Sequence, residues 1–218
     1  MNGLLVVWES RDVFLWGAAN TLSLVLGCLL LSIPLGILGA ILLTEAPKPL
    51  RRLMAEIVDL LRCVPFLLLA YVVYYGLPEL GLRLTSWWAG LASLTVYTTA
   101  YLVEIFRAAF LAVARDNIEA AHAFGLSRSL LYRRIILPQV AITAAPVIGN
   151  QIITTIRDSA LLMIITVQEL TFAANFVSAN HFSPLAPFAA AVGLYLLMSF
   201  VVEEGVRRME SVRRVRYG

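Results

Sequence analysis

A few ionisable and polar side chains interrupt long apolar stretches, and these are the residues that could do chemistry. Arg157 and Asp158 are adjacent, and Gln151 lies seven residues before Asp158, on roughly the same side of a helix. Charged groups in an apolar environment are costly, so they normally face a cavity or a partner. Because a zwitterion carries an ammonium and a carboxylate, we expect Gln151, Arg157 and Asp158 to line a substrate path. The alternative is that the charged pair only reaches the lipid headgroups.

Three other polar sets show short spacings: Glu104 with Arg107; Glu56 with Asp59 and Arg62; and the run Tyr97, Thr98 and Thr99. Residues three apart face each other on a helix, so the first set favours an intrahelical ion pair and the second a structural role. We interpret the third set as a polar contact between helices rather than as part of the substrate path.

The sequence contains no recognisable catalytic or metal-binding constellation. Its single lysine, Lys48, does not follow a glycine, so the phosphate-binding motif G-x-x-x-x-G-K-[ST] is absent. His122 and His181 are expected on opposite sides of the membrane. Cys28 and Cys63 lie in apolar runs, where unpaired thiols behave as small hydrophobic groups. We therefore expect no catalytic residue, no bound metal and no cofactor on this chain.

The composition excludes a water-soluble domain. Hydrophobic residues make up 60% of the 218 residues and charged residues 14%, with a mean hydropathy of +0.83. An average soluble domain has about 25% charged residues, so this chain could not cover a surface that faces water. An integral membrane protein remains.

A bilayer core needs about 20 predominantly apolar residues per helix. The apolar stretches are Phe14–Leu43, Leu53–Leu77, Trp87–Phe106, Ile135–Ile156, Ala160–Ala174 and Leu185–Val202. Pro34, Gly36 and Gly39 in the first stretch allow a kink or a close helix contact. The pattern predicts an all-α membrane protein.

The distribution of basic residues predicts the orientation. Thirteen of the seventeen lie in three segments, which are the link 45–52, the stretch 107–134 and the tail 207–218. By the positive-inside rule all three are cytoplasmic, which also argues against a nucleic-acid partner. The last two must be separated by an even number of crossings, so the shortest intervening stretch, Ala160–Ala174, is expected to be re-entrant or at the outer face. The prediction is five spans, with the N-terminus outside and the C-terminus in the cytoplasm.

These observations divide the chain into an external N-terminal segment 1–13, a transmembrane domain 14–206 and a basic cytoplasmic tail 207–218. Within the domain, loop 115–134 reads as two short helices around Gly125, which tolerates a left-handed conformation. Asp116 and Glu119 fit a capping box that opens the first helix, Ile118–Phe124. Ser127 can cap the second helix. The alternative is an ordinary amphipathic loop that lies on the headgroups.

At this loop the chain resembles a known family. The run Glu119-Ala120-Ala121, followed by Gly125 and by Ile136-Leu137-Pro138, resembles the EAA loop of membrane subunits of ATP-binding-cassette importers. Four further stretches resemble the polar amino-acid branch: AYLVEIFR at 100–107, RCVP at 62–65, YYGLP at 74–78 and RDSAL at 157–161. The resemblance covers about residues 17–205. Two departures are Asp116-Asn117 for the usual Gly-Gln, and Asn150-Gln151 for a frequent Asn-Glu.

The resemblance implies a type I importer fold and a role in amino-acid transport across the bacterial inner membrane. The implied partners are a second permease subunit (the same chain or a related one), an extracytoplasmic amino-acid-binding protein, and an ATPase subunit that holds ATP and magnesium. Glu119, Ala120, Ala121, Gly125 and Leu126 would couple this chain to the ATPase. Gln151 in place of a glutamate argues against a strictly basic substrate. The alternative is a stand-alone secondary transporter or channel, but such a protein should show an internal repeat, and none is visible.

Overall fold

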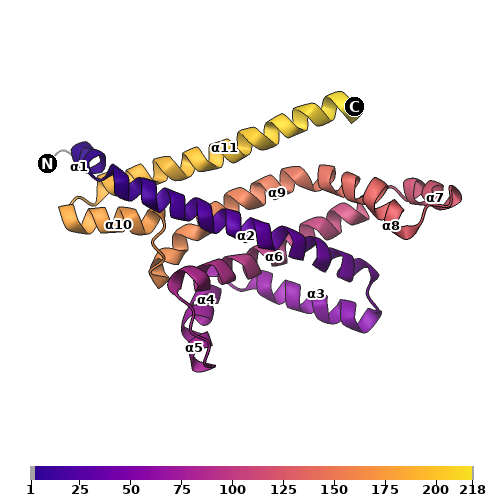
Figure 1. The fold of residues 1–218 in the computed structure, drawn as a ribbon, viewed down its shortest axis with the longest axis horizontal. Coiled ribbons are helices and arrows are strands. Elements are labelled where there is room, and N and C mark those ends of the chain that lie inside the picture. The colour runs from indigo at the N-terminus through magenta and orange to yellow at the C-terminus, as the bar shows by residue number, and fades with distance from the viewer. Residues whose placement is uncertain (1–2, 218) are drawn as a thin grey trace.

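The computed structural model describes residues 3–217, and side chains for 3–114 and 116–208; within these bounds its regular elements are all helices (Figure 1). The α-helices are α1 Gly3–Glu9, α2 Arg11–Glu45, α3 Lys48–Cys63, α4 Phe66–Tyr71, α5 Leu77–Glu79, α6 Ser86–Leu111, α7 Arg115–Ala123, α8 Arg128–Leu131, α9 Leu137–Ser159, α10 Leu170–His181 and α11 Leu185–Tyr217. π-Helical turns at Val72–Gly76 and Tyr132–Ile136 and a 3-10 helix at Ala160–Ile165 join some of them.

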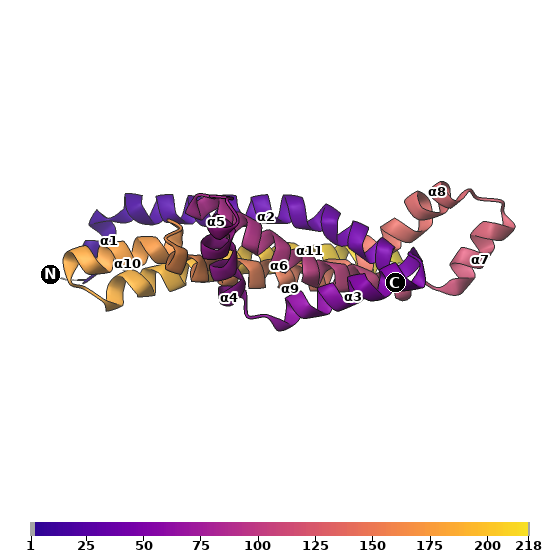
Figure 2. The same cartoon turned by 90° about the horizontal axis from the view of Figure 1, so that it is seen from below.

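The long helices run side by side and give the molecule two distinct ends. The pair α7 and α8 lies at one end, and α1 and α10 lie at the other (Figures 1 and 2). Helix α11 starts beside α10 and runs toward the end that carries α7, so the two ends of the chain lie toward opposite ends of the bundle (Figure 1). That the N-terminal end lies outside and the C-terminal end in the cytoplasm stays a prediction from the basic residues.

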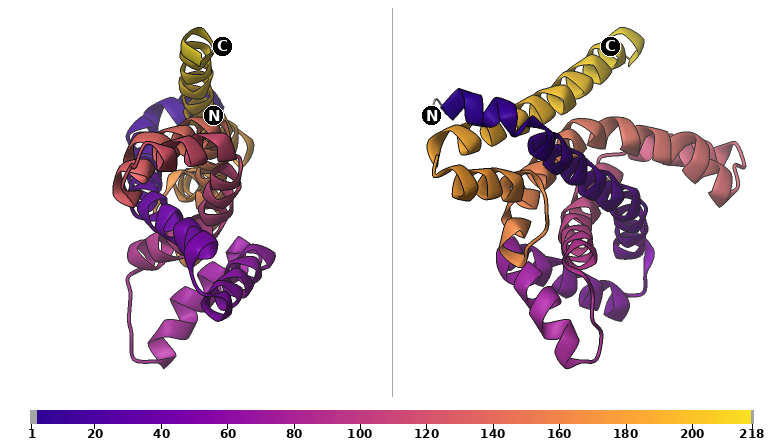
Figure 3. Two further views of the ribbon diagram at one scale, coloured as in Figure 1. Left: turned by 90° about the vertical axis from the view of Figure 1, so that its right-hand side faces the viewer. Right: turned by 60° about the vertical axis from the view of Figure 1, so that its left-hand side comes forward.

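Four helical stretches of the described chain are long and apolar enough to cross a membrane, and a bent pair makes a possible fifth. That pair contains the predicted apolar stretch Leu53–Leu77 and is broken within it. Helix α3 ends at Cys63, and the next helical stretch, Phe66–Glu79, is turned by 102° (Figure 3). Pro65 causes the break, because proline has no amide hydrogen and holds the preceding residue, here Val64 at ψ 133°, in an extended conformation.

Helices α2 and α6 pack closely because small residues of α2 face the backbone of α6. A Cβ atom on Gly36 would lie 2.7 Å from the Leu102 Cβ, and one on Gly39 would lie 2.5 Å from the Val103 Cγ2. In a membrane, where lipid tails are as apolar as leucine, such close backbone approach is a main source of helix association. The sequence allows a kink or a close helix contact here, and the structure has the close contact.

The stretch Ala160–Ala174, predicted as re-entrant or lying at the outer face, forms no single helix of spanning length. The 3-10 helix ends at Ile165, the next residue Thr166 has a left-handed φ of 61°, and α10 starts at Leu170. This hairpin packs against α2 at the end of the bundle opposite α7.

A buried glutamate holds the hairpin in place. Glu169 is fully buried, and its carboxylate accepts hydrogen bonds from the amides of Thr171 (2.8 Å) and Phe172 (2.7 Å) and from the Tyr195 hydroxyl of α11 (2.5 Å). Burial raises the pKa of Glu169, while these hydrogen bonds oppose the rise. The adjoining Leu170 amide donates to the hydroxyl of Thr21 in α2. The hairpin is therefore attached to both α2 and α11 through polar contacts.

Replacing Gly17 with valine should destabilise this end of the molecule. A Cβ on Gly17 would lie 2.8 Å from the Ala173 Cβ and 3.2 Å from the Glu169 backbone oxygen, and backbone atoms yield little. Overpacking costs about 1–3 kcal/mol, so the thermal unfolding midpoint in detergent should fall by several degrees. Gly193→Val is the matched control, because a Cβ on Gly193 meets no atom within 4 Å. Equal midpoints for the two variants would show that the contact is not tight.

Candidate functional site

The first candidate site is the helix-turn-helix formed by α7 and α8. Gly125 has a φ of +68°, as expected for the residue that ends the first helix. The predicted capping box is wrong. Helix α7 starts at Arg115 with Ala114 at the cap position, so Asp116 lies inside the first turn. Ser127 does precede α8, but its side chain makes no capping hydrogen bond.

The two faces of this loop have different surroundings. Ala121 is 3% exposed and packs with the ends of α6 and α9, and Leu126 is half-buried in the same cluster. Glu119, Ala120 and Gly125 are exposed. Within the described residues, the carboxylate of Glu119 has no hydrogen bond or ion pair. The loop therefore presents an exposed carboxylate next to small residues, which allow a partner backbone to approach.

The loop is anchored to the bundle at the end of α2. The carboxylate of Glu45 forms an ion pair with Arg128 of α8 and accepts a hydrogen bond from the hydroxyl of Tyr132. The ring of Tyr132 lies 6.4 Å from that of Phe110, near the end of α6. A displacement of α7 and α8 would therefore be transmitted to α2 and α6.

The second candidate site is a polar seam along α3, α6 and α9. We define this polar seam by six residues: Asp59 and Arg62 of α3, Tyr97, Tyr101 and Glu104 of α6, and Asp158 of α9. The three residues of α6 are spaced four and three apart, so they share one face of that helix.

Arg62 is the centre of the contacts that join α3 to α6. The guanidinium of Arg62 lies over the ring of Tyr101, and the distance from the Arg62 Cζ to the ring centroid is 5.5 Å. The Nη1 atom of Arg62 also lies 3.5 Å from the Asp59 Oδ1. The Tyr101 hydroxyl is 3.3 Å from both the backbone oxygen of Arg62 and the hydroxyl of Tyr97. The buried Arg62 Nε has no hydrogen-bond partner among the described residues. Among the described residues, Arg62 thus keeps an unsatisfied buried donor, whereas buried donors are normally hydrogen-bonded.

The next turn of α6 carries the ion pair that the sequence predicts. Arg107 donates to Glu104 through Nε at 2.8 Å and through Nη2 at 2.5 Å. Thr98 also agrees with its expected role, because its hydroxyl lies 3.3 Å from that of Thr155 and joins α6 to α9.

The three residues of α9 predicted to line a substrate path have different environments. Asp158 is partly buried and near enough to the Tyr97 hydroxyl for the two to interact electrostatically. Gln151 is 7% exposed, and its amide nitrogen has no hydrogen-bond partner in the described part of the chain. Arg157 is exposed and lies along its own helix, with Nη2 3.4 Å from the Thr154 hydroxyl.

The sequence interpretation missed Arg62 and Tyr101 as members of this site. The available signal was the position of Arg62 inside an apolar stretch, since a charge at membrane depth is a functional candidate by default. Its i,i+3 spacing from Asp59 suggested a structural pair instead. The pair exists, but the arginine also contacts α6.

Comparisons with known proteins agree with this architecture. Residues 32–211 match the family described as "binding-protein-dependent transport system inner membrane component". The chain is 30% identical over 206 residues to the probable glutamine ABC transporter permease protein GlnM of Bacillus subtilis, covering 94% of this chain and 95% of that one. It is 30% identical over 200 residues to the arginine ABC transporter permease protein ArtQ of Haemophilus influenzae, covering 88% and 90%.

Among solved structures, the fold is similar to that in a crystal structure of an amino acid ABC transporter with histidines. The TM-score is 0.87 at 24% identity, over 95% of this chain and 97% of that chain. The break after α3, the short helices α7 and α8 and the hairpin before α10 therefore lie in a fold that such transporters use.

Proposed function

Because the chain belongs to the family of binding-protein-dependent transport system inner membrane components, we propose that it is a permease subunit that moves a polar amino acid inward at the expense of ATP hydrolysed elsewhere. The observation that carries this proposal is the exposed α7–α8 loop, with small residues beside a Glu119 that has no partner among the described side chains, on a chain of this family. Relatives named for glutamine and arginine support the choice of an amino acid.

The loop is proposed to dock on an ATPase subunit, which holds the ATP and magnesium. Glu119, Ala120 and Gly125 would meet the partner directly, while Ala121 and Leu126 fix the loop to the bundle. Two copies of the permease, or this chain and a related one, would stand side by side. Closure of the ATPase subunits on nucleotide would draw the loops together and open the path outward, and hydrolysis would reset it. This chain itself performs no catalysis.

The proposed orientation places α7 and α8 in the cytoplasm of a bacterial inner membrane, with the N-terminus outside and the C-terminus inside. The concentration of basic residues at this end of the bundle supports it. The hairpin around Glu169 would then lie toward the outer face, where an extracytoplasmic binding protein delivers its amino acid.

The polar seam is proposed to form this chain's side of the substrate path, together with Gln151 and Arg157. Asp158 would bind the ammonium of the amino acid. Arg62 and Arg157 are the cations proposed for its carboxylate, and the Nε of Arg62 has no partner among the described residues. The amide nitrogen of Gln151, which has no partner in the described part of the chain, would be a further donor to a passing solute.

The test is uptake by proteoliposomes that contain this chain, its ATPase subunit and the cognate binding protein. We expect labelled amino-acid uptake only when ATP and loaded binding protein are both present. Uptake that follows an ion gradient without ATP would refute the proposal and favour the stand-alone secondary transporter. A panel of amino acids presented by the binding protein would identify the substrate.

A further inference from the structure

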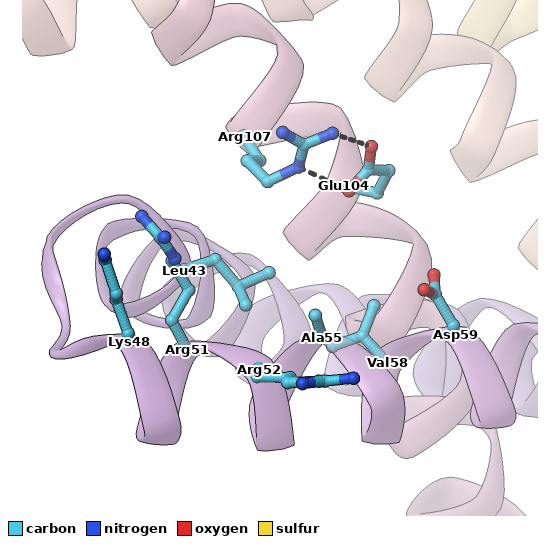
Figure 4. A pocket seen from close by; sticks show the side chains of 9 residues that line it. All are labelled: Leu43, Lys48, Arg51, Arg52, Ala55, Val58, Asp59, Glu104 and Arg107. Atoms are coloured by element: carbon cyan, nitrogen blue, oxygen red, sulfur yellow. Dashed lines mark hydrogen bonds and ion pairs between the residues drawn. The ribbon is translucent and has the colours of Figure 1, made fainter.

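A charged cavity lies between α3 and α6, beyond the polar seam on the side of α7. Its volume is about 670 Å³, and it is lined by Leu43, Lys48, Arg51, Arg52, Ala55, Val58, Asp59, Glu104 and Arg107 (Figure 4). Two lining residues, Asp59 and Glu104, belong to the polar seam. The cavity is therefore continuous with the seam, and its size is within the range of small-molecule sites.

The lining carries more positive than negative charge, and both carboxylates are paired. Asp59 lies 3.5 Å from Arg62, and Glu104 is held by two hydrogen bonds from Arg107. Arg52 pairs with Glu56 at 3.3 Å. These pairs leave the cavity with cations that no carboxylate neutralises.

Lys48 and Arg51 are those cations. Within the described residues, neither side chain forms an ion pair or hydrogen bond. Both project from the same side of α3, at the end of the cavity away from Asp59, and the Arg107–Glu104 pair faces them from α6 (Figure 4). A concave site with unpaired charges of one sign attracts a ligand of the opposite sign.

The surroundings of α3 argue that the ligand is a solute in the path rather than a lipid. The exposed apolar residues of this helix, Leu50, Leu53, Ile57 and Leu60, lie on the face opposite Lys48 and Arg51. Acyl chains would cover that apolar face. The cavity instead continues the polar seam, along which a solute would move.

We propose that this cavity is the cytoplasmic vestibule of the path, and that Lys48 and Arg51 bind the carboxylate of the departing amino acid. The inference deepens the proposed function and rests on it. Rings of basic side chains favour anions in pores, and the same charge disfavours cations. The vestibule therefore selects neutral polar and acidic amino acids over lysine and arginine.

The test is direct binding to the purified permease–ATPase complex without binding protein, so that the binding protein's own selectivity does not contribute. Titration calorimetry with glutamate, glutamine and arginine should rank glutamate first and arginine last. The double variant Lys48→Gln/Arg51→Gln should weaken glutamate binding by about ten-fold and leave arginine binding equal or stronger. The control Arg133→Gln/Arg134→Gln removes two exposed cations outside the cavity and should keep the wild-type ranking.

Several outcomes would overturn the inference. If arginine bound as tightly as glutamate, or if the two double variants had equal effects, the vestibule would not select among amino acids. Inorganic phosphate that binds as tightly as glutamate, and through Lys48 and Arg51, would show a general anion site. Thermal unfolding of each variant establishes that the complex is folded. If ATP-driven uptake is absent from wild type, the proposed function is wrong. If uptake is present but the three amino acids do not bind in the expected order, only the vestibule inference is wrong.

Discussion

A transporter that carries Glu119→Arg is expected to lose ATP hydrolysis stimulated by the loaded binding protein, while the permease subunits remain assembled. Glu119 is exposed and has no partner within the described chain, so its replacement costs the fold little. In the docked complex, the change removes a directional contact and adds a longer cation beside Ala120. Loss of an interface hot spot costs roughly 2–4 kcal/mol, which predicts at least a thirty-fold fall in stimulated activity.

The measurement is ATPase activity in proteoliposomes, with and without loaded binding protein. Glu79→Arg is the matched control, because Glu79 is also exposed and lies on α5, away from α7. We expect the control to retain stimulation. If Glu119→Arg retains it as well, α7 does not transmit the ATPase motion, and the loop is an ordinary connection on the headgroups.

The α7–α8 loop shows how much local sequence patterns predict. Gly125 was predictable because few residues tolerate its left-handed φ of +68°. The start of α7 was not predictable in this way. Asp116 and Glu119 have the residue types and spacing of a capping box, but the helix starts before Asp116. Helix boundaries also depend on packing, here of Ala121 and Leu126 against α6 and α9, which a local pattern does not contain.

Hydropathy alone located the spans but not their breaks. The long apolar helices α2, α6, α9 and α11 follow from composition, since a spanning segment must satisfy its backbone internally. The turn of 102° after α3 had a visible signal in Pro65. Its consequence is that α3 alone carries the charged residues from Lys48 to Arg62 along α6.

The polar seam depended on contacts between distant segments. Arg62 and Tyr101 are 39 residues apart, and neither carries a motif that predicts the other. The charge of Asp158 and its place at the end of an apolar stretch were enough to select it from the sequence. The other helices of the polar seam became known only from the fold. Sequence therefore identified single polar residues of this region, and tertiary packing supplied the arrangement that joins α3, α6 and α9.

Asp158→Asn is expected to reduce amino-acid uptake by roughly ten- to hundred-fold while the complex stays folded. The substitution keeps the size of the side chain and removes the charge that would bind the substrate ammonium. A hydrogen bond to a charged group contributes about 1.5–3 kcal/mol, which sets the size of the effect. Uptake is measured in the reconstituted transporter, with Asp12→Asn as control, because Asp12 is exposed at the far end of α2.

The same variant separates the two explanations for a charge at this position. If Asp158 only reaches toward headgroups, the asparagine variant should transport at the wild-type rate, and the path would not include α9 at this turn. If Asp158 binds the ammonium, uptake should fall and basal ATP hydrolysis should persist, because α7 and α8 are unchanged. Asp158→Glu should then recover part of the uptake, since it restores the charge at a slightly different distance from Tyr97.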